Sequence, residues 1–230
     1  MNDATAALIV AIISYLVGAI PFGYLIPKWC KGIDIREHGS GNPGATNVLR
    51  TMGNEWGILV LCLDLLKGLL PVWLLPMWLL PSDSPAMLHL RVLAGVAAIV
   101  GHMLPVYLQF RGGKGVATAL GVVIVLGGWG TPVAVATFLI TFAAWRLVAL
   151  SSMLAVSAFA ITQLVVLYPY PSQTWSLLGF SVAAPLLIIY RHRSNIVRLW
   201  NREEERTEIG KRSSSVKNEV PTESDEDSAA

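Results

Sequence analysis

The chain has 230 residues, of which 54% are hydrophobic and only 14% carry a charge. Soluble domains have about 25% charged residues, so this composition excludes an ordinary soluble domain and indicates a membrane protein. The formal net charge of +2 is uninformative as a sum, but the placement of the charges is not. Two cysteines, Cys30 and Cys62, suggest neither a disulfide framework nor a metal site, and we expect no metal or other cofactor.

Seven apolar segments have the character of membrane-spanning helices, because about 20 apolar residues are needed to cross ~30 Å of hydrocarbon. They lie at 4–27, 57–80, 88–108, 116–130, 132–147, 149–168 and 175–190. The fourth and fifth are short, and GGWGTP at 127–132 predicts a turn between them, with one long, kinked helix as the alternative. We therefore expect an all-α polytopic membrane protein with seven transmembrane helices in one membrane-embedded domain, residues 1–200.

Lysine and arginine gather on one side of this arrangement. With the N-terminus outside, the inside segments hold all of the seventeen basic residues except Lys67 and Arg91. A six-span arrangement separates the basic residues less cleanly, so the positive-inside rule favours an external N-terminus and a cytosolic C-terminus. The glutamate-rich segment 201–230 ends in TESDEDSAA and is expected to be a polar cytosolic tail, helical at first and then disordered.

The first polar motif is GSGNPGATNVLR at 39–50, between the first and second apolar segments. Asn42-Pro43-Gly44 indicates a turn, and the small residues leave backbone N–H groups accessible. Arg50 can bind a phosphate or a carboxylate through two parallel hydrogen bonds. A glycine-rich turn followed by a topology-setting arginine explains the same residues equally well.

The second motif is FRGGKGVAT at 110–118, where the fourth apolar segment begins. Three glycines surround Lys114, and free N–H groups at a helix N-terminus beside a lysine form an anion site. Gly115 follows the lysine where a Walker A loop requires serine or threonine, so this is not a nucleotide-binding loop of that class. A flexible basic loop is the simpler alternative.

Charged and titratable side chains also lie inside the apolar segments. Asp64 and Lys67, in LDLLKG, are three residues apart and share a helix face. Placing charges at this depth costs free energy, and such side chains face each other or a cavity. A structural ion pair therefore explains these two residues at least as well as a catalytic role does. His102, in GHMLP, lies near the inner end of the third segment, where a single histidine is more often a hydrogen-bonded structural group than a base.

The last motif, RHRSNIVRL at 191–199, follows the seventh apolar segment. His192, Asn195 and Arg198 are spaced by three residues and share one helix face. A basic collar at the level of the lipid headgroups explains the arginines but not Asn195. All these polar motifs meet at one membrane surface, which suggests a phosphate-bearing substrate held where a lipid chain also reaches.

Together, GSGNPGATNVLR, LDLLKG, GHMLPVYLQFRGGKGVAT and RHRSNIVRL resemble the bacterial acyl-phosphate:glycerol-3-phosphate acyltransferases over roughly residues 5–200. The resemblance implies seven spans in the bacterial inner membrane and an active site facing the cytosol. It also implies transfer of a fatty acyl group from acyl phosphate to the 1-hydroxyl of glycerol 3-phosphate. The products are lysophosphatidate and phosphate, in the first acylation step of phospholipid synthesis. The HxxxxD motif of other glycerolipid acyltransferases is missing, as expected for this family.

The same resemblance implies Ser40, Arg50, Lys114, His192 and Asn195 as the central site. From the residues themselves and this resemblance together, we expect catalytic roles for Ser40, His192 and Asn195, substrate binding by Asn42, Asn47, Arg50, Gly112, Gly113, Lys114 and Gly115, and support from Asp64, Lys67, His102 and Arg198. One departure is that Arg202 stands at the glycine position of the family's RLxxGxE pattern, followed by Glu203 and Glu204. The expected partners are the two substrates and membrane lipid, with no nucleic acid, for a monomer that associates with the enzyme making acyl phosphate.

Two other classes remain open at this point. A transporter for an organic phosphate predicts the same anion-binding motifs and the Asp64–Lys67 pair, but alternating access needs a site near the membrane midplane. A non-catalytic membrane subunit gives no reason for two glycine-rich anion loops.

Overall fold

The computed structural model describes residues 2–168 and 171–207, in which all regular secondary structure is helical. In chain order the elements are α1 (Asp3–Ala19), α2 (Phe22–Lys31), the 3-10 helix η1 (Ile35–Glu37), α3 (Ala45–Met52), α4 (Asn54–Leu79), α5 (Met87–Met103), the 3-10 helix η2 (Val106–Leu108), α6 (Val116–Leu126), α7 (Gly130–Trp145), α8 (Val148–Leu167), α9 (Pro171–Arg191) and α10 (Arg193–Trp200).

Five of the described segments are long and apolar enough to cross a membrane: Asp3–Lys31, Asn54–Leu79, Met87–Leu108, Val148–Leu167 and Ser172–Arg191. α6 and α7 are also apolar but have only 11 and 16 residues, fewer than the ~20 that a perpendicular span needs. Large apolar side chains such as Leu8, Ile140 and Ile161 are more than half exposed, as lipid-facing positions are. The prediction of an all-helical, multi-pass membrane protein is confirmed.

The first expected helix, 4–27, is interrupted. α1 ends at Ala19 and α2 begins at Phe22, with Ile20 in a non-helical conformation (φ -57°, ψ 115°) before Pro21. Proline disfavours the helical conformation of the residue that precedes it. The predicted span 4–27 falls within one candidate membrane span, Asp3–Lys31, but it contains a break that the apolar pattern did not predict. The predicted turn near 127–132 is present, since α6 ends at Leu126 and α7 begins at Gly130; the alternative of one long, kinked helix is wrong.

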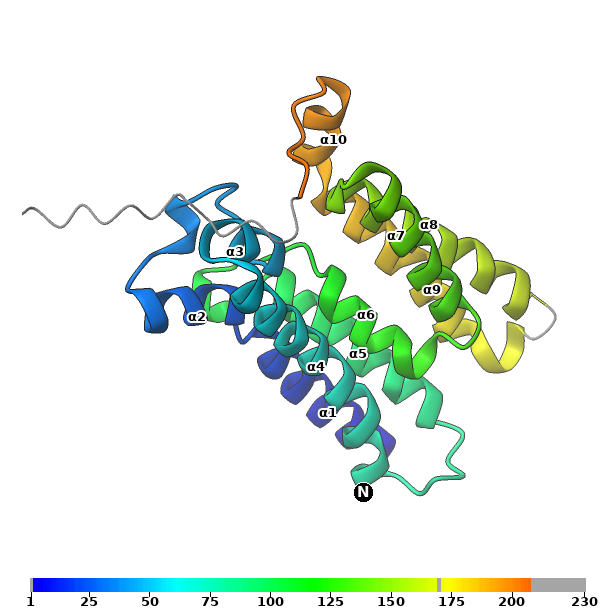
Figure 1. The fold of residues 1–230 in the computed structure, drawn as a ribbon. Coiled ribbons are helices and arrows are strands. Elements are labelled where there is room, and N and C mark those ends of the chain that lie inside the picture. Colours follow the sequence, from blue (N-terminus) through cyan, green and yellow to red (C-terminus); the bar gives the residue numbers. More distant parts are fainter. Residues whose placement is uncertain (1, 169–170, 208–230) are drawn as a thin grey trace, which may run out of the picture.

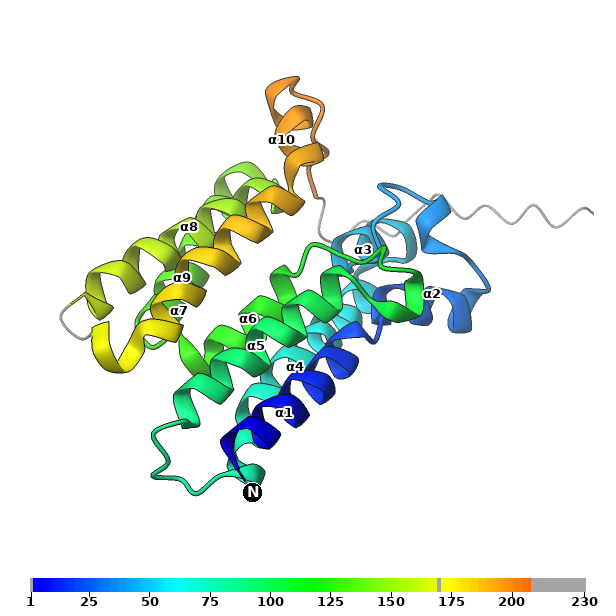
Figure 2. The same ribbon diagram turned by 180° about the vertical axis from the view of Figure 1, so that it is seen from behind.

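The long helices form two groups (Figure 1). α1, α4, α5 and α6 lie side by side, and α7, α8 and α9 form a second group, as the view from behind also shows (Figure 2). α2, α3 and α10 gather at the same end of the molecule, opposite the N-terminus (Figure 1). Three of the polar motifs lie on α3 and the loop before it, on the loop before α6, and on the end of α9 with α10, so the fold brings these motifs to that end.

Glycine allows close packing within the first group. A Cβ on Gly68 of α4 would collide with the backbone of Thr118 in α6, and a Cβ on Gly121 of α6 would collide with the backbone of Leu65 in α4. Small residues of this kind let membrane helices approach closely, where van der Waals contact supplies much of the association energy. This contact holds the start of α6, next to Lys114, firmly against α4.

The chain turns back after α10. The N–H of Glu203 donates to the carbonyl of Arg198 at 2.7 Å, and the N–H of Arg202 donates to Leu199 at 3.2 Å. Arg202 has a φ of 62°, the left-handed conformation that closes a helix in a Schellman motif. The expectation that the tail begins as a helix is therefore wrong for residues 203–207, and the rest of the predicted tail, 208–230, lies outside the described residues.

Candidate active site

A polar cavity of about 140 Å³ opens at the end of the molecule where the motifs meet. All but three of the residues expected at the site line it. They are Ser40, Asn42, Asn47, Arg50, Asp64, His102, Lys114, Gly115, His192, Asn195 and Arg198. Gly112, Gly113 and Lys67 are not among the lining residues. Five separate stretches of the chain therefore converge on one cavity.

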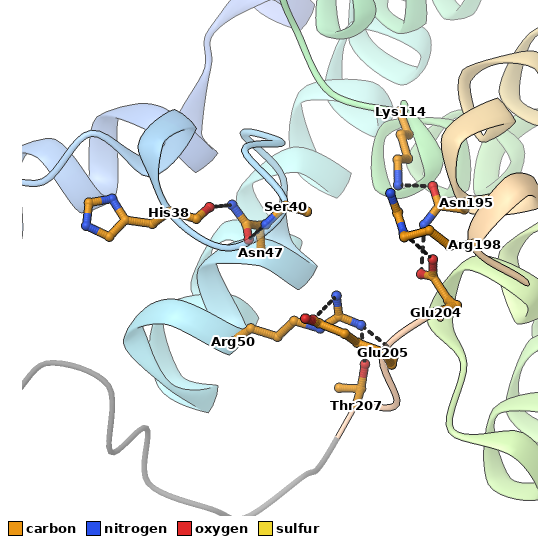
Figure 3. A network of polar contacts seen from close by, with 10 residues as sticks. All are labelled: His38, Ser40, Asn47, Arg50, Lys114, Asn195, Arg198, Glu204, Glu205 and Thr207. Carbon is orange, nitrogen blue, oxygen red and sulfur yellow. Dashed lines mark hydrogen bonds and ion pairs between the residues drawn. The ribbon is translucent and has the colours of Figure 1, made fainter. Parts of the chain in front are cut away.

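Asn47 shapes the loop that carries Ser40. Its side chain is 2% exposed, its amide nitrogen donates to the carbonyls of Ile35 at 3.2 Å and His38 at 2.9 Å, and its oxygen accepts from the N–H of Ser40 at 3.0 Å. Because the amide is fully engaged by the backbone, Asn47 holds the loop in place rather than leaving its own donors for a ligand. Figure 3 shows Ser40 fixed above α3 in this way.

A chain of polar contacts runs across the cavity (Figure 3). Lys114 Nζ donates to Asn195 Oδ1 at 2.5 Å, and Asn195 Nδ2 donates to Glu204 Oε1 at 2.7 Å. Arg198 Nε forms an ion pair with Glu204 Oε2 at 2.8 Å. Glu204 thus aligns the amide of Asn195 so that its oxygen faces Lys114.

Lys114 is a cation in a partly dry environment. Burial lowers the pKa of its ammonium from 10.5 to about 8, against the opposing effect of the Glu204 carboxylate, while Arg198, Arg50 and Arg191 lower it further. The lysine is therefore mostly protonated at neutral pH. A second anion would stabilise the protonated form, so an anionic ligand and this charge favour each other.

Free N–H groups lie beside Lys114 at the start of α6. The first N–H groups of a helix have no acceptor within the helix, and Val116 and Ala117, the first residues of α6, line the cavity. The positive end of the helix dipole adds to the lysine charge. The arrangement matches a phosphate-binding helix N-terminus.

His192 is buried, with 2% of its surface exposed. Its Nδ1 lies 2.8 Å from the carbonyl oxygen of Ile188, and because a carbonyl only accepts, Nδ1 carries the hydrogen. Burial lowers the pKa of the imidazole to about 4, and the charge of Lys114 lowers it further. The ring is therefore neutral at neutral pH, and Nε2 is left with a lone pair that accepts a hydrogen bond.

Gly112 and Gly113 were expected to bind substrate, but they do not line the polar cavity. Their N–H groups donate to the carbonyls of Met103 and His102, each at 3.2 Å, so these amides are used within the protein. A side chain on Gly113 would collide with the His102 ring. The two glycines thus let the loop lie directly on the end of α5, which sets the position of Lys114.

Arg191 holds the other face of the same loop. Its Nη2 donates to the carbonyls of Gly112 at 2.9 Å and Gly113 at 3.0 Å, with Met103 at 3.3 Å. The guanidinium thereby ties the loop to the end of α9, next to His192. Arg191 was not among the expected site residues, because in RHR it is indistinguishable from a topology-setting charge.

Asp64, Lys67 and His102 form the buried floor beneath the loop. Lys67 Nζ lies 2.7 Å from Asp64 Oδ1 and donates to the carbonyl of Ile20 at 2.7 Å. His102 Nδ1 is 3.8 Å from the same carboxylate oxygen. Lys67 therefore joins α4 to the break between α1 and α2, which fits the structural interpretation of this pair.

Arg50 is held by residues 203–207, which we call the C-terminal strap (Figure 3). Arg50 Nη1 is 3.1 Å from Glu205 Oε2, and its Nη2 donates to the Glu205 carbonyl at 2.8 Å. Thr207 contacts Arg50 Nη2 at 3.4 Å, and its own N–H donates to the Arg146 carbonyl at 2.8 Å. The strap thus links α3 to the end of α7 beside the cavity.

Glu204 is the main residue that the sequence analysis did not assign. It aligns with the glutamate of RLxxGxE, although Arg202 replaces the glycine. The left-handed φ of Arg202 shows why glycine suits that position. Arginine adopts the same conformation here, so the turn and the placement of the glutamate are kept.

Two further cavities adjoin the polar one. An apolar cavity of about 310 Å³ lies between α6, α7, α8 and α9 and shares Leu61, Val116, Ala117, Phe138 and Ser152 with it. A wider basin of about 720 Å³ shares Ser40, Asn42, Lys114 and Arg198 with it. The basin is mainly basic, with four more arginines on its walls: Arg36, Arg111, Arg191 and Arg193. An anion and an apolar chain can therefore reach the polar cavity from different sides.

The comparisons with known proteins agree on one family. Residues 8–202 match the model of the family described as glycerol-3-phosphate acyltransferase. A glycerol-3-phosphate acyltransferase of Synechococcus elongatus is 42% identical over 211 residues, covering 88% of this chain and 94% of its own. One of Myxococcus xanthus is 43% identical over 206 residues, covering 88% of this chain and 99% of its own.

Two similar solved structures point to the same family. The crystal structure of PlsY, an integral membrane glycerol 3-phosphate acyltransferase, in its glycerol 3-phosphate form has a TM-score of 0.77 and 40% identity, covering 88% of this chain and 96% of that one. The lysophosphatidic acid form of that enzyme has a TM-score of 0.75, with 95% of its chain covered. With its fold, its polar motifs and its sequence all in agreement, the chain belongs to the glycerol-3-phosphate acyltransferase family of integral membrane enzymes.

Proposed function

We propose that this enzyme transfers a fatty acyl group from acyl phosphate to the 1-hydroxyl of glycerol 3-phosphate, giving lysophosphatidate and phosphate. The observation that carries the proposal is the junction of a cationic cavity with an apolar one. The solved relative carries glycerol 3-phosphate in one form and lysophosphatidic acid in another. Membership of an acyltransferase family also argues against the transporter and the non-catalytic subunit.

The cationic groups suit two phosphates held close together. Lys114 and the start of α6 form one anion site, and Arg50 offers a second. The Nε of Arg50 is buried without a hydrogen-bond partner among the described residues, so an entering phosphate oxygen can satisfy it. Binding by charged donors at close quarters holds both substrates in a reactive orientation.

An acyl phosphate is already activated, so the enzyme needs no covalent intermediate. We place the carbonyl of the donor near Asn195 and Ser40, which orient it, and the glycerol hydroxyl near Nε2 of His192. A neutral imidazole with its pKa near 4 is a weak base, so it accepts a hydrogen bond from the hydroxyl and orients it. The departing phosphate oxygen takes the proton as the new ester bond forms and the acyl–phosphate bond breaks.

The membrane arrangement is part of the proposal. Seven spans with an external N-terminus put the polar cavity and the basin at the cytosolic surface of the bacterial inner membrane, where basic residues are favoured. The two short helices α6 and α7 both border the apolar cavity. At this surface the protein acts as a monomer and associates with the enzyme that makes acyl phosphate, from which it receives its donor.

The test is to supply purified enzyme with glycerol 3-phosphate and one donor at a time: acyl phosphate, acyl-coenzyme A or acyl carrier protein. We expect lysophosphatidate and inorganic phosphate from acyl phosphate alone. Robust transfer from acyl-coenzyme A with none from acyl phosphate would show that the donor is assigned wrongly.

A further inference from the structure

The apolar cavity has a near end and a far end. Its near end is formed by the residues it shares with the polar cavity, including Val116 of α6 and Ser152 of α8. Its lining continues along α6 to Val123 and along α8 to Phe159. α7 and α9 run the opposite way (Figure 1), and their first lining residues, Ala134 and Phe180, belong to the same far end.

The cavity is shorter than a membrane acyl chain. Phe159 follows Ser152 by seven positions along α8, which corresponds to about 10.5 Å along the axis of a helix. One leaflet of a bilayer, whose depth a fatty acyl chain fills, is about 15 Å of hydrocarbon. A long acyl chain that enters from the polar cavity therefore meets the far end before it is fully enclosed.

Phe159 closes that far end and is itself fixed from behind. Its side chain is only 4% exposed. A Cβ on Gly127 or on Gly130 would lie 2.9 Å from a ring carbon of Phe159, which is inside normal contact distance. The glycines of the GGWGTP turn thus make room for this ring, and the turn supports it against displacement.

We propose that Phe159, seated on the Gly127–Gly130 turn, is the specificity-determining residue that ends the acyl-chain cavity and sets the enzyme's preference for acyl chain length. This inference rests on the proposed function, because it takes the apolar cavity as the place of the donor's acyl chain. Phe180 borders the same end, but no glycine turn supports its ring among the described residues. Phe159 is therefore the better candidate for a rigid stop.

Two substitutions move the stop in opposite directions. Phe159→Ala removes the ring and lengthens the cavity toward the turn. Ala155→Leu places a larger side chain one helical turn nearer the polar cavity, at a lining position that is 8% exposed. Ile161→Ala on the same helix is the matched control, because Ile161 is 63% exposed and does not line the cavity.

The measurement is the ratio of kcat/KM for hexadecanoyl phosphate to that for decanoyl phosphate, with glycerol 3-phosphate saturating. This ratio does not depend on the fraction of folded enzyme. Phe159→Ala should raise it by about fourfold for each methylene newly buried, Ala155→Leu should lower it, and Ile161→Ala should leave it unchanged. Should Phe159→Ala fail to fold, Phe159→Leu supplies the same measurement with a smaller increase.

A ratio that stays at the wild-type value in the Phe159 variants and in Ala155→Leu would overturn the proposal, while transfer itself remained intact. Failure of the proposed function would be seen differently: wild-type enzyme would transfer the acyl group from neither hexadecanoyl phosphate nor decanoyl phosphate.

Discussion

Replacing Lys114 with alanine should lower kcat/KM for glycerol 3-phosphate by about 10- to 150-fold, the effect of one charge-assisted hydrogen bond. Lys114 lines the polar cavity and contacts Asn195 at 2.5 Å. Its loss removes the cation beside the start of α6 and leaves the Asn195 oxygen without its donor. Steady-state kinetics on purified enzyme measure the change. Arg111→Ala is the control, since Arg111 belongs to the same loop but lines only the outer basin.

The pH dependence makes this prediction sharper. With a pKa of about 8, Lys114 is charged below pH 8 and loses its proton as the pH rises through that value. The substrate phosphate, with a pKa near 6, is already doubly charged there. The KM for glycerol 3-phosphate should therefore rise above pH 8, and Lys114→Arg should abolish that rise, because arginine stays protonated. Wild-type kinetics in Lys114→Ala, or a rise that persists in Lys114→Arg, would contradict the phosphate-binding role.

Asp64→Leu should destabilise the protein by about 3–5 kcal/mol, because it leaves a buried charge without its partner. Asp64 is 1% exposed and Lys67 is 4% exposed, and their charged atoms are 2.7 Å apart. The lysine ammonium would keep the Ile20 carbonyl at 2.7 Å and the Phe22 ring at 5.7 Å as contacts, neither of which carries a negative charge. Reversible unfolding in detergent measures the free energy of unfolding.

The double variant Asp64→Leu/Lys67→Met is the decisive control. Removing both charges takes away the desolvation penalty as well as the attraction, so its stability should return to within about 1 kcal/mol of wild type or exceed it. Equal destabilisation of the single and the double variant would show that the ion pair is not what Asp64 contributes. Acyl transfer by the stable double variant separates the structural role from a chemical one, and we expect it to be retained.

Much of the architecture follows from patterns that are local in the sequence. Apolar segments of suitable length predicted the helices, and GGWGTP predicted the turn after α6, because these signals depend on neighbouring residues alone. The break at Pro21 was missed because the apolar character continues across it. Hydropathy measures composition, and the conformation at Ile20 depends instead on the proline that follows.

Less of the candidate site than of the helices could be predicted from the sequence. Glycine, lysine and arginine motifs indicated which residues share one end, and the polar cavity brings most of them together. Spacing along the chain does not say which N–H groups are already used, so the engagement of Gly112 and Gly113 by α5 was not foreseen. The contacts of Arg50 with Glu205 and of Glu204 with Asn195 depend on how α10 ends. The sequence did not predict that ending, because Arg202 stands at a position where glycine is usual.

The central claim is that the acyl group passes directly from the donor phosphate to the glycerol hydroxyl, with Ser40 as a positioning group. The backbone N–H of Ser40 donates to Asn47 Oδ1 at 3.0 Å, and the nearby His38 donates its Nδ1–H to the Asp34 carbonyl at 2.9 Å, so neither hydrogen bond activates the Ser40 hydroxyl. A nucleophilic serine needs an adjacent base. The direct test is to incubate the enzyme with labelled acyl phosphate alone, quench it, and analyse the peptide carrying Ser40 by mass spectrometry. We predict no acyl-serine at any time point, whereas an acyl-Ser40 adduct that forms and is consumed at the turnover rate would contradict direct transfer.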